Sequence, residues 1–205
     1  MTKFKWFVFT FLLCIFLFFA YMVSINKIYP FDNYIYNIVK VDNNLLTCLY
    51  KFVTLFSSPF MIILICFLSF FIDKKYGFLI TTNAVLIFLF NYFLKLFFAR
   101  PRPYDLMMIF ESGYSFPSGH AMLSLGFYGF IIFLIDRINL DKSSKVIFKV
   151  FLGIFIFLIG MSRIYLGVHY PSDVCAGFTI SGAYLIVYIS ILDKYLKGDV
   201  DGKNL

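Results

Sequence analysis

Residues 52–94 read FVTLFSSPFMIILICFLSFFIDKKYGFLITTNAVLIFLFNYFL. The stretch contains two uncharged segments, Phe52 to Ile72 and Tyr76 to Leu94, separated only by the charged triplet at 73–75. An α-helix rises about 1.5 Å per residue, so each segment is long enough to approach or span a hydrocarbon core about 30 Å thick. The pattern predicts two consecutive transmembrane helices.

The rest of the chain has the same apolar character. Of its 205 residues, 61% are hydrophobic and 14% are charged, whereas an average soluble domain is about 45–50% apolar and about 25% charged. Four further apolar runs predict spans at Trp6–Ile25, Pro117–Ile135, Val146–Ser162 and Val174–Leu192. The first run exceeds the usual length of a signal-peptide core, so we interpret it as a retained span. We therefore expect an all-α polytopic membrane protein with six transmembrane helices, forming a single domain over residues 1–205.

The connection between the first two spans has a mixed pattern. From Pro30 to Lys51, apolar residues recur near helical spacing among polar ones. This pattern predicts one or two interfacial helices lying on the membrane surface, with an ordinary connecting loop as the alternative.

The basic residues indicate an orientation. The chain carries a formal charge of +7, and its Lys and Arg lie mostly in short connections, where they meet lipid headgroups rather than nucleic acid. Six spans put both termini on one side, together with eleven of the 18 Lys and Arg. The positive-inside rule then predicts cytoplasmic termini in a cell-membrane protein. The four cysteines show no C-x-x-C spacing, so the sequence predicts neither a disulfide framework nor a zinc site.

Ionisable residues gather at the span ends on the other, extracytoplasmic side, where they are costly unless they have a function. They lie in three segments: Lys95 to Pro103, Pro117 to His120, and Ser162 to Asp173. Their candidate site residues are Lys95, Arg102, Ser118, Gly119, His120, Arg163, His169 and Asp173.

This set of residues suits a phosphoryl group. Three cations, a hydroxyl and the N–H groups at a helix start match a tetrahedral anion with about two negative charges. His120 and His169 offer a nucleophile and a general acid. Asp173, four residues after His169, can accept a hydrogen bond from one imidazole nitrogen and leave the other free to attack. The cations and the helix dipole neutralise charge without a metal, so we expect no metal and no cofactor.

The three segments resemble a known signature. Lys95-x6-Arg102-Pro103, Pro117-Ser118-Gly119-His120 and Ser162-Arg163-x5-His169-x3-Asp173 match that of the phosphatidic acid phosphatase type 2 superfamily, which also contains vanadium haloperoxidases and glucose-6-phosphatase. The resemblance implies that His169 attacks phosphorus to form a phosphohistidine, that His120 protonates the leaving oxygen, and that Asp173 orients His169. It also implies that Lys95, Arg102, Ser118, Gly119 and Arg163 hold the phosphate until water releases it.

Among members of this superfamily, a small chain with six expected spans most resembles the bacterial lipid phosphatases. The expected function is therefore hydrolysis of a lipid phosphomonoester or pyrophosphate, such as undecaprenyl pyrophosphate, phosphatidylglycerophosphate or phosphatidic acid. A lipid phosphotransferase using the same site, and a transporter that binds phospholipid without cleaving it, are the alternatives. The membrane spans disfavour a haloperoxidase.

Several nearby residues have two interpretations. Arg100 is either a solvated or lipid-facing charge or a ligand of a second phosphate. Glu111, Tyr114, Tyr165 and Tyr170 could contact substrate, but aromatic residues near a membrane surface more often belong to the interfacial belt. A metal pair formed by Asp105 and Glu111 has little support from their spacing.

Overall fold

The computed structural model describes residues 1–201, with the side chains of 1–193, and every regular element in that range is helical. The elements are α1 (Lys3–Ser24), α2 (Tyr29–Val39), α3 (Asn44–Leu55), α4 (Pro59–Ile72), α5 (Lys74–Phe98), the 3-10 turn η1 (Tyr104–Leu106), α6 (Gly119–Leu123), the π-helical turn η2 (Ser124–Tyr128), α7 (Gly129–Ile135), α8 (Lys142–Tyr165) and α9 (Pro171–Asp201).

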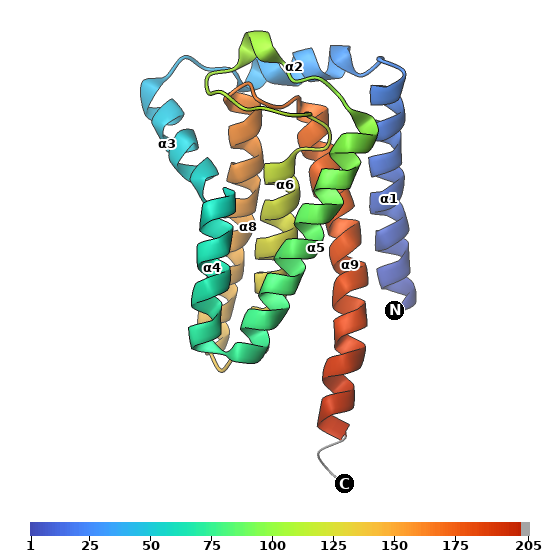
Figure 1. The fold of residues 1–205 in the computed structure, drawn as a ribbon, viewed down its shortest axis with the longest axis vertical. Helices are drawn as coiled ribbons and strands as arrows, with labels where there is room; N and C mark the ends of the chain where they lie inside the picture. Colours follow the sequence, from blue (N-terminus) through green and yellow to red (C-terminus); the bar gives the residue numbers. More distant parts are fainter. Residues whose placement is uncertain (202–205) are drawn as a thin grey trace.

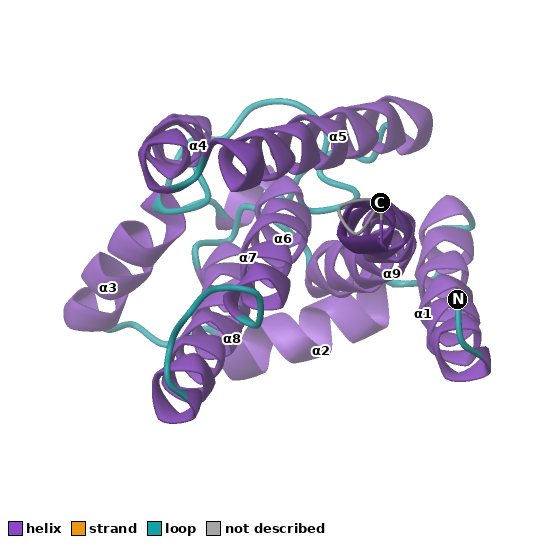
Figure 2. Ribbon diagram, turned by 90° about the horizontal axis from the view of Figure 1, so that it is seen from below, coloured by secondary structure: helices purple, strands orange, loops and turns teal. Residues whose placement is uncertain are grey.

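The helices form an upright bundle. The long helices run along its axis, while α2 lies across the upper end, and α1 begins at the opposite end, toward which α9 also runs (Figure 1). Seen along the axis, α6 and α7 lie inside the bundle, and α1 packs against α9 at its edge (Figure 2). The connections that meet at the upper end are therefore those after α1, α5 and α8.

Four of the described helices are long and apolar enough to cross a membrane: α1, α5, α8, and α9 as far as Asp193. The rod formed by α6, η2 and α7, from Gly119 to Ile135, is apolar but shorter. The expected span over Phe52–Ile72 is not one continuous helix but the end of α3 followed by α4. The chain bends by 49° between α3 and α4, because Pro59 has no N–H and its ring disfavours a helical residue before it.

Most helices begin where a polar side chain can satisfy a free backbone N–H. The Asp73 carboxylate accepts from the N–H of Tyr76 at 2.9 Å, and Asp141 does the same for Ser144 at 2.8 Å. The stretch Pro30–Lys51 is helical over most of its length, in α2 and the first part of α3, as the helical interpretation predicted.

The outward faces of the bundle are apolar. On α4, Phe60, Ile63, Phe67 and Phe71 are all exposed, whereas the same helix buries Cys66 against the core between α5, α7 and α8. Helices that are apolar on both faces are typical of membrane proteins.

Polar side chains fix the inner rod. The amide of Asn83 on α5 donates to the carbonyl of Gly126 at 2.8 Å and accepts from the Tyr184 hydroxyl of α9 at 3.1 Å. Ser181 on α9 donates to the carbonyl of Met122 at 2.8 Å. A π-turn leaves such carbonyls without their usual helical partners, so these bonds hold the rod, and the start of α6 above it, against α5 and α9.

Candidate active site

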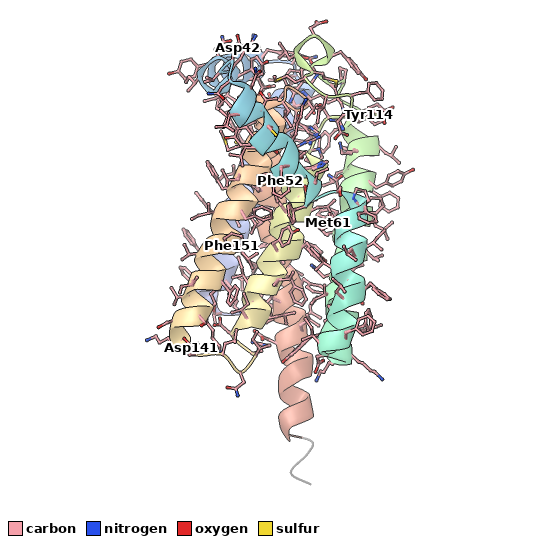
Figure 3. The ribbon with its side chains drawn as sticks, turned by 90° about the vertical axis from the view of Figure 1, so that its left-hand side faces the viewer. Asp42, Phe52, Met61, Tyr114, Asp141 and Phe151 are labelled. Atoms are coloured by element: carbon pink, nitrogen blue, oxygen red, sulfur yellow. The ribbon has the colours of Figure 1, made fainter. Side chains whose placement is uncertain are left out.

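The three sequence segments come together at the upper end of the bundle. They are the last turns of α5 with the loop at 99–118, the start of α6, and the loop at 166–170 with the start of α9. Figure 3 shows Tyr114, on the first loop, at this end, and Asp141 at the opposite end. The candidate residues therefore lie on one face of the fold.

Direct bonds join the segments. The Asn91 amide of α5 donates to the carbonyl of Pro117 at 3.2 Å, and the N–H of Ser118 donates to the carbonyl of Asp173 at 3.0 Å. A Cβ at Gly119 would lie only 3.0 Å from Oδ1 of Asn91, so the absence of a side chain there lets the Asn91 amide approach the start of α6 closely.

His169 lies buried between a cation and a carboxylate. Arg102 Nη1 is 3.1 Å from His169 Nε2, and Asp173 Oδ2 is 3.4 Å from His169 Nδ1. A guanidinium has only donors, so Nε2 is the accepting nitrogen and the proton of the neutral ring is on Nδ1. The lone pair of Nε2 therefore points toward the cations, on the side away from Asp173.

The surroundings of His169 favour the neutral ring. Burial holds the pKa of His169 well below 6.5, and the positive charges of Lys95, Arg102 and Arg163 lower this pKa further. The imidazole is consequently unprotonated near neutral pH and able to act as a nucleophile.

Arg163 is fully buried at the end of α8. Its guanidinium donates to the hydroxyl of Thr54 at 2.5 Å and forms an ion pair with Glu111. Its Nε–H has no hydrogen-bond partner among the described residues. A buried donor without a partner is costly, so this one is available to an anion.

The other two cations bind mainly to carbonyl groups. Lys95 Nζ donates to the carbonyl of Tyr114. Arg102 donates to the carbonyls of Ser112, Gly113 and Val168, at 3.2, 3.1 and 2.8 Å. Glu111 is also 3.9 Å from Arg102. In this structure one carboxylate thus faces two of the three cations.

The start of α6 completes the set. Ser118 caps this helix by accepting from the N–H of Ala121 at 3.5 Å. His120 is half-buried in its first turn, near enough that a positive charge on it would lower the pKa of His169. All eight candidate residues are therefore in one region. Among the described residues, no group of three or more His, Cys, Asp or Glu is arranged to hold a metal.

Two interpretations of neighbouring residues are corrected. Arg100 is not a solvated or lipid-facing charge: it is 5% exposed and pairs with Asp32 and Asp173. Its possible role at a second phosphate stays a hypothesis. Tyr165 does not belong to an interfacial belt, because it is 2% exposed and its hydroxyl bonds with Thr47 at 2.9 Å.

Sequence reasoning missed three contributors to this region: Thr54, the pairing of Glu111 with arginine, and Asp32. Thr54 and Asp32 lie far from the motifs along the chain, and only folding brings them close. One signal was available in the sequence: Arg100 lies between the motif residues Lys95 and Arg102, so a carboxylate that pairs with it would also lie near the site.

The fold and the three segments define a known class of membrane protein. The model of the PAP2 superfamily matches residues 74–197, and the chain belongs to this family. Phosphatidylglycerophosphatase B from Bacillus subtilis (strain 168) is 36% identical over 110 residues, which are 53% of this chain and 54% of that protein. The matched region thus spans about half the length of this curated relative.

Solved structures share the architecture. A crystal structure described as the first transmembrane PAP2-type phosphatidylglycerolphosphate phosphatase, from Bacillus subtilis, superimposes with a TM-score of 0.81 at 27% identity. The match covers 91% of this chain and 96% of that one. The structure of Aquifex aeolicus LpxE has the same fold, with a TM-score of 0.61 at 24% identity over 76% of this chain and 93% of that one. This chain therefore has the fold of a membrane PAP2 protein.

Proposed function

We propose that this chain is a single-domain membrane phosphatase that hydrolyses the phosphomonoester or pyrophosphate of a lipid through a phosphohistidine. The observation that carries the proposal is the position of His169, whose Nε2 lone pair faces Arg102 while Nδ1 faces Asp173. Such an arrangement is what an in-line attack on a bound phosphate requires. Candidate substrates are phosphatidylglycerophosphate, the lipid named for the Bacillus subtilis relative and its solved structure, and undecaprenyl pyrophosphate or phosphatidic acid.

The reaction has two steps. In the first, Nε2 of His169 forms a bond to phosphorus and the bond from phosphorus to the lipid oxygen breaks. His120, protonated once the negative charge of the bound phosphate offsets the three cations, gives that oxygen a proton. In the second, water bonds to phosphorus, the P–N bond breaks, and His120 takes the proton of the water. Lys95, Arg102, Ser118, Gly119 and Arg163 hold the phosphate oxygens, and the Asp173 carboxylate stabilises the positive charge of the phosphorylated ring. Phosphate binding displaces Glu111 from Arg163. The cations neutralise the transition state, so the reaction needs no metal.

The membrane arrangement extends the proposal. Six spans would cross the bilayer, with the bent pair α3–α4 and the shorter rod from Gly119 to Ile135 each counted as one, and α2 and the first part of α3 would lie at the interface. The termini would then be cytoplasmic and the site extracytoplasmic.

An apolar groove supports lateral access for the lipid. It has a volume of about 340 Å³, lies between α4 and α5, and is lined by Pro59, Cys66, Leu89 and Leu123 among others. Leu123 is one helical turn below His120. A lipid tail lying there would stay in an apolar environment while the headgroup reached the cations, which avoids exposing apolar surface at roughly 25 cal/mol per Å².

Phosphate release tests the activity. Purified protein in detergent, with chelator present, is incubated with phosphatidylglycerophosphate, phosphatidic acid and undecaprenyl pyrophosphate, and free phosphate is measured. We expect release from at least one of these lipids, and the inactive control is the His169→Gln variant. Transfer to an added lipid alcohol without free phosphate would indicate a phosphotransferase, and saturable binding without turnover would indicate a carrier.

Cysteine labelling tests the orientation. In a variant without the four native cysteines, single cysteines replace Asp105 and Lys142, which are exposed at opposite ends of the bundle. A membrane-impermeant thiol reagent added to intact cells should label position 105 and not 142, and permeabilised cells should be labelled at both. Labelling of intact cells at 142 alone would overturn the proposed topology.

A further inference from the structure

Behind the carboxylate of Asp173, on the side away from His169, lies a second buried cluster. Arg100 Nη1 donates to Asp173 Oδ1 at 2.6 Å and to the Ser172 hydroxyl at 2.8 Å, and Arg100 Nη2 donates to Asp32 Oδ2 at 2.7 Å. The side chains of all four residues are almost completely shielded from solvent. One guanidinium therefore bridges two buried carboxylates.

Asp32 belongs to α2, outside the region that matches the family model. Besides the bond to Arg100, its Oδ1 accepts from the Ser172 N–H at 2.8 Å and its Oδ2 accepts from the Ser172 hydroxyl at 2.9 Å. The Ser172 N–H is one of the free donors in the first turn of α9, where a negative charge is favourable. Asp32 thus joins α2 to the start of the helix that carries Asp173.

Aromatic rings restrict the guanidinium further. Arg100 Cζ lies 4.0 Å from the ring centre of Tyr170 and 5.6 Å from that of Tyr29. These two rings meet edge to face, with centroids 5.8 Å apart. Ion pairs on two sides and rings on the others leave Arg100 little freedom to move.

The two oxygens of Asp173 consequently have separate partners. Oδ1 faces Arg100, whereas Oδ2 accepts from the Tyr170 N–H at 3.0 Å and faces His169 Nδ1 at 3.4 Å. Rotation of the carboxylate would break the bond to Arg100. A buried carboxylate also needs a compensating charge to remain ionised, and Arg100 is the cation in contact with this one.

We propose that Arg100 and Asp32 are positioning residues of the catalytic site: Arg100 fixes the carboxylate of Asp173, Asp32 holds Arg100, and together they strengthen the preference for the proton on Nδ1 of His169 that the contact of Arg102 with Nε2 also favours. The inference rests on the proposed phosphatase function, in which Nε2 is the attacking atom. It also makes α2 part of the catalytic machinery rather than only a connection between two spans.

The tautomer of His169 tests the proposal without any turnover. The chain has two histidines, so in a His120→Gln background the ¹⁵N spectrum of labelled histidine reports His169 alone. At a pH where the ring is neutral, the parent should give two well-separated resonances, with the proton on Nδ1. In the Arg100→Gln and Asp32→Asn variants of this background, the two resonances should move part of the way toward each other, because Asp173 then holds the Nδ1 proton less firmly while the contact of Arg102 with Nε2 remains.

Kinetics provide a second measurement, in the chain that retains His120. We expect Arg100→Gln to lower kcat about 100-fold and Asp32→Asn about 10-fold, with KM changed by less than about twofold, since neither side chain is placed to touch the phosphate. Asp42→Asn is the matched control, because Asp42 is an exposed carboxylate in the same connection, and it should leave kcat and the tautomer unchanged.

A substitution that only weakens the packing of this network should lower stability without changing the tautomer of His169. Ser172→Ala removes hydroxyl bonds to Asp32 and Arg100 but leaves the ion pair between Arg100 and Asp173. We expect it to lower the melting temperature while His169 keeps its proton on Nδ1. If Arg100→Gln does not fold, Arg100→Lys provides the same test, because an ammonium cannot bridge both carboxylates as the guanidinium does.

Failure of the positioning proposal can be distinguished from failure of the phosphatase proposal. Folded Arg100→Gln or Arg100→Lys and Asp32→Asn proteins that keep the parent tautomer would overturn the positioning proposal while leaving the phosphatase proposal intact. A parent protein that releases no phosphate from any lipid tested would overturn the phosphatase proposal, and the tautomer measurement would still report on the network.

Discussion

Arg100 and Arg102 are separated only by Pro101, yet they lie on opposite sides of the same histidine. Arg102 donates to Nε2 of His169 and to three backbone carbonyls, with a carboxylate no nearer than the 3.9 Å contact to Glu111. Arg100 reaches the Nδ1 side through Asp173 and bonds two carboxylates at 2.6 and 2.7 Å. Because carbonyl groups carry no net charge, they do not neutralise Arg102, whose positive charge remains able to attract an anion. The positive charge of Arg100 is already compensated by two carboxylates.

The difference shows how one loop can supply one arginine that pairs with carboxylates and another that remains available to an anion. Pro101 and Pro103 prevent the helix from continuing, so successive side chains point to different sides of the loop. Loop bonds fix the result, with Ser115 N–H donating to the carbonyl of Arg100 at 2.8 Å and the Ser115 hydroxyl to that of Pro101 at 3.0 Å. Position along the chain is therefore a poor guide to which arginine remains available to an anion.

The largest effect is expected at His169, which lies between Arg102 on its Nε2 side and the pair of Asp173 and Arg100 on its Nδ1 side. His169→Ala should reduce phosphate release to less than a few per cent of the parent, because no other residue of the cluster is placed to attack phosphorus. The measurement is turnover by the purified variant, with a melting curve to show that it is folded. Substantial remaining turnover would mean that the nucleophile is another residue.

The second prediction separates the two arginines directly. Arg102→Gln removes a charged donor from the phosphate, and a hydrogen bond to a charged group contributes about 1.5–3 kcal/mol, roughly a 10- to 100-fold effect. We expect inhibition by inorganic phosphate or vanadate to weaken by that factor. Arg100→Gln should leave this inhibition nearly unchanged while kcat falls. Equal effects of both substitutions on inhibitor binding would abolish the distinction between the two arginines.

The third prediction concerns the acidity of His169. Burial and the surrounding cations disfavour the imidazolium, so protonating the ring requires more acid than usual. In the His120→Gln background, ¹⁵N titration should place the midpoint below pH 6.5, and saturating inorganic phosphate should move it upward by adding negative charge. A midpoint at or above pH 6.5 without phosphate would show that the three cations do not act on this ring.

The smallest effect is expected at Glu111, which forms an ion pair with Arg163 and would compete with a bound phosphate for it. Its side chain is 28% exposed, and ion pairs of partly exposed groups are weak, so Glu111→Gln should tighten inhibition by inorganic phosphate only about threefold to tenfold. Asp105→Asn is the control, since Asp105 is an exposed carboxylate on the same loop. Weaker binding of phosphate to Glu111→Gln would mean that Glu111 supports the anion site instead of competing for it.

The sequence by itself determined the class of protein and supplied the candidate site residues, which the fold brings into one region. Uncharged runs long enough for a bilayer predict helices, since a backbone in lipid must satisfy its own hydrogen bonds. Pro59 and Asp73 mark helix starts through local geometry. Pro59 also marks the bend between α3 and α4, which a prediction from hydrophobicity alone does not include. The candidate site residues could be named because three short segments of the sequence match the signature of the family.

Only the tertiary structure decided which groups pair with these residues. Asp32 and Arg100 are 68 positions apart and Thr54 and Arg163 are 109 apart, so no local rule relates them. The choice between the two arginines likewise depended on which side of the loop each one faces. The physical reason is that a buried charge is stabilised by whatever opposite charge or dipole the fold brings within about 3 Å, and that partner is selected by the packing of α2, α3 and α9 rather than by proximity along the chain.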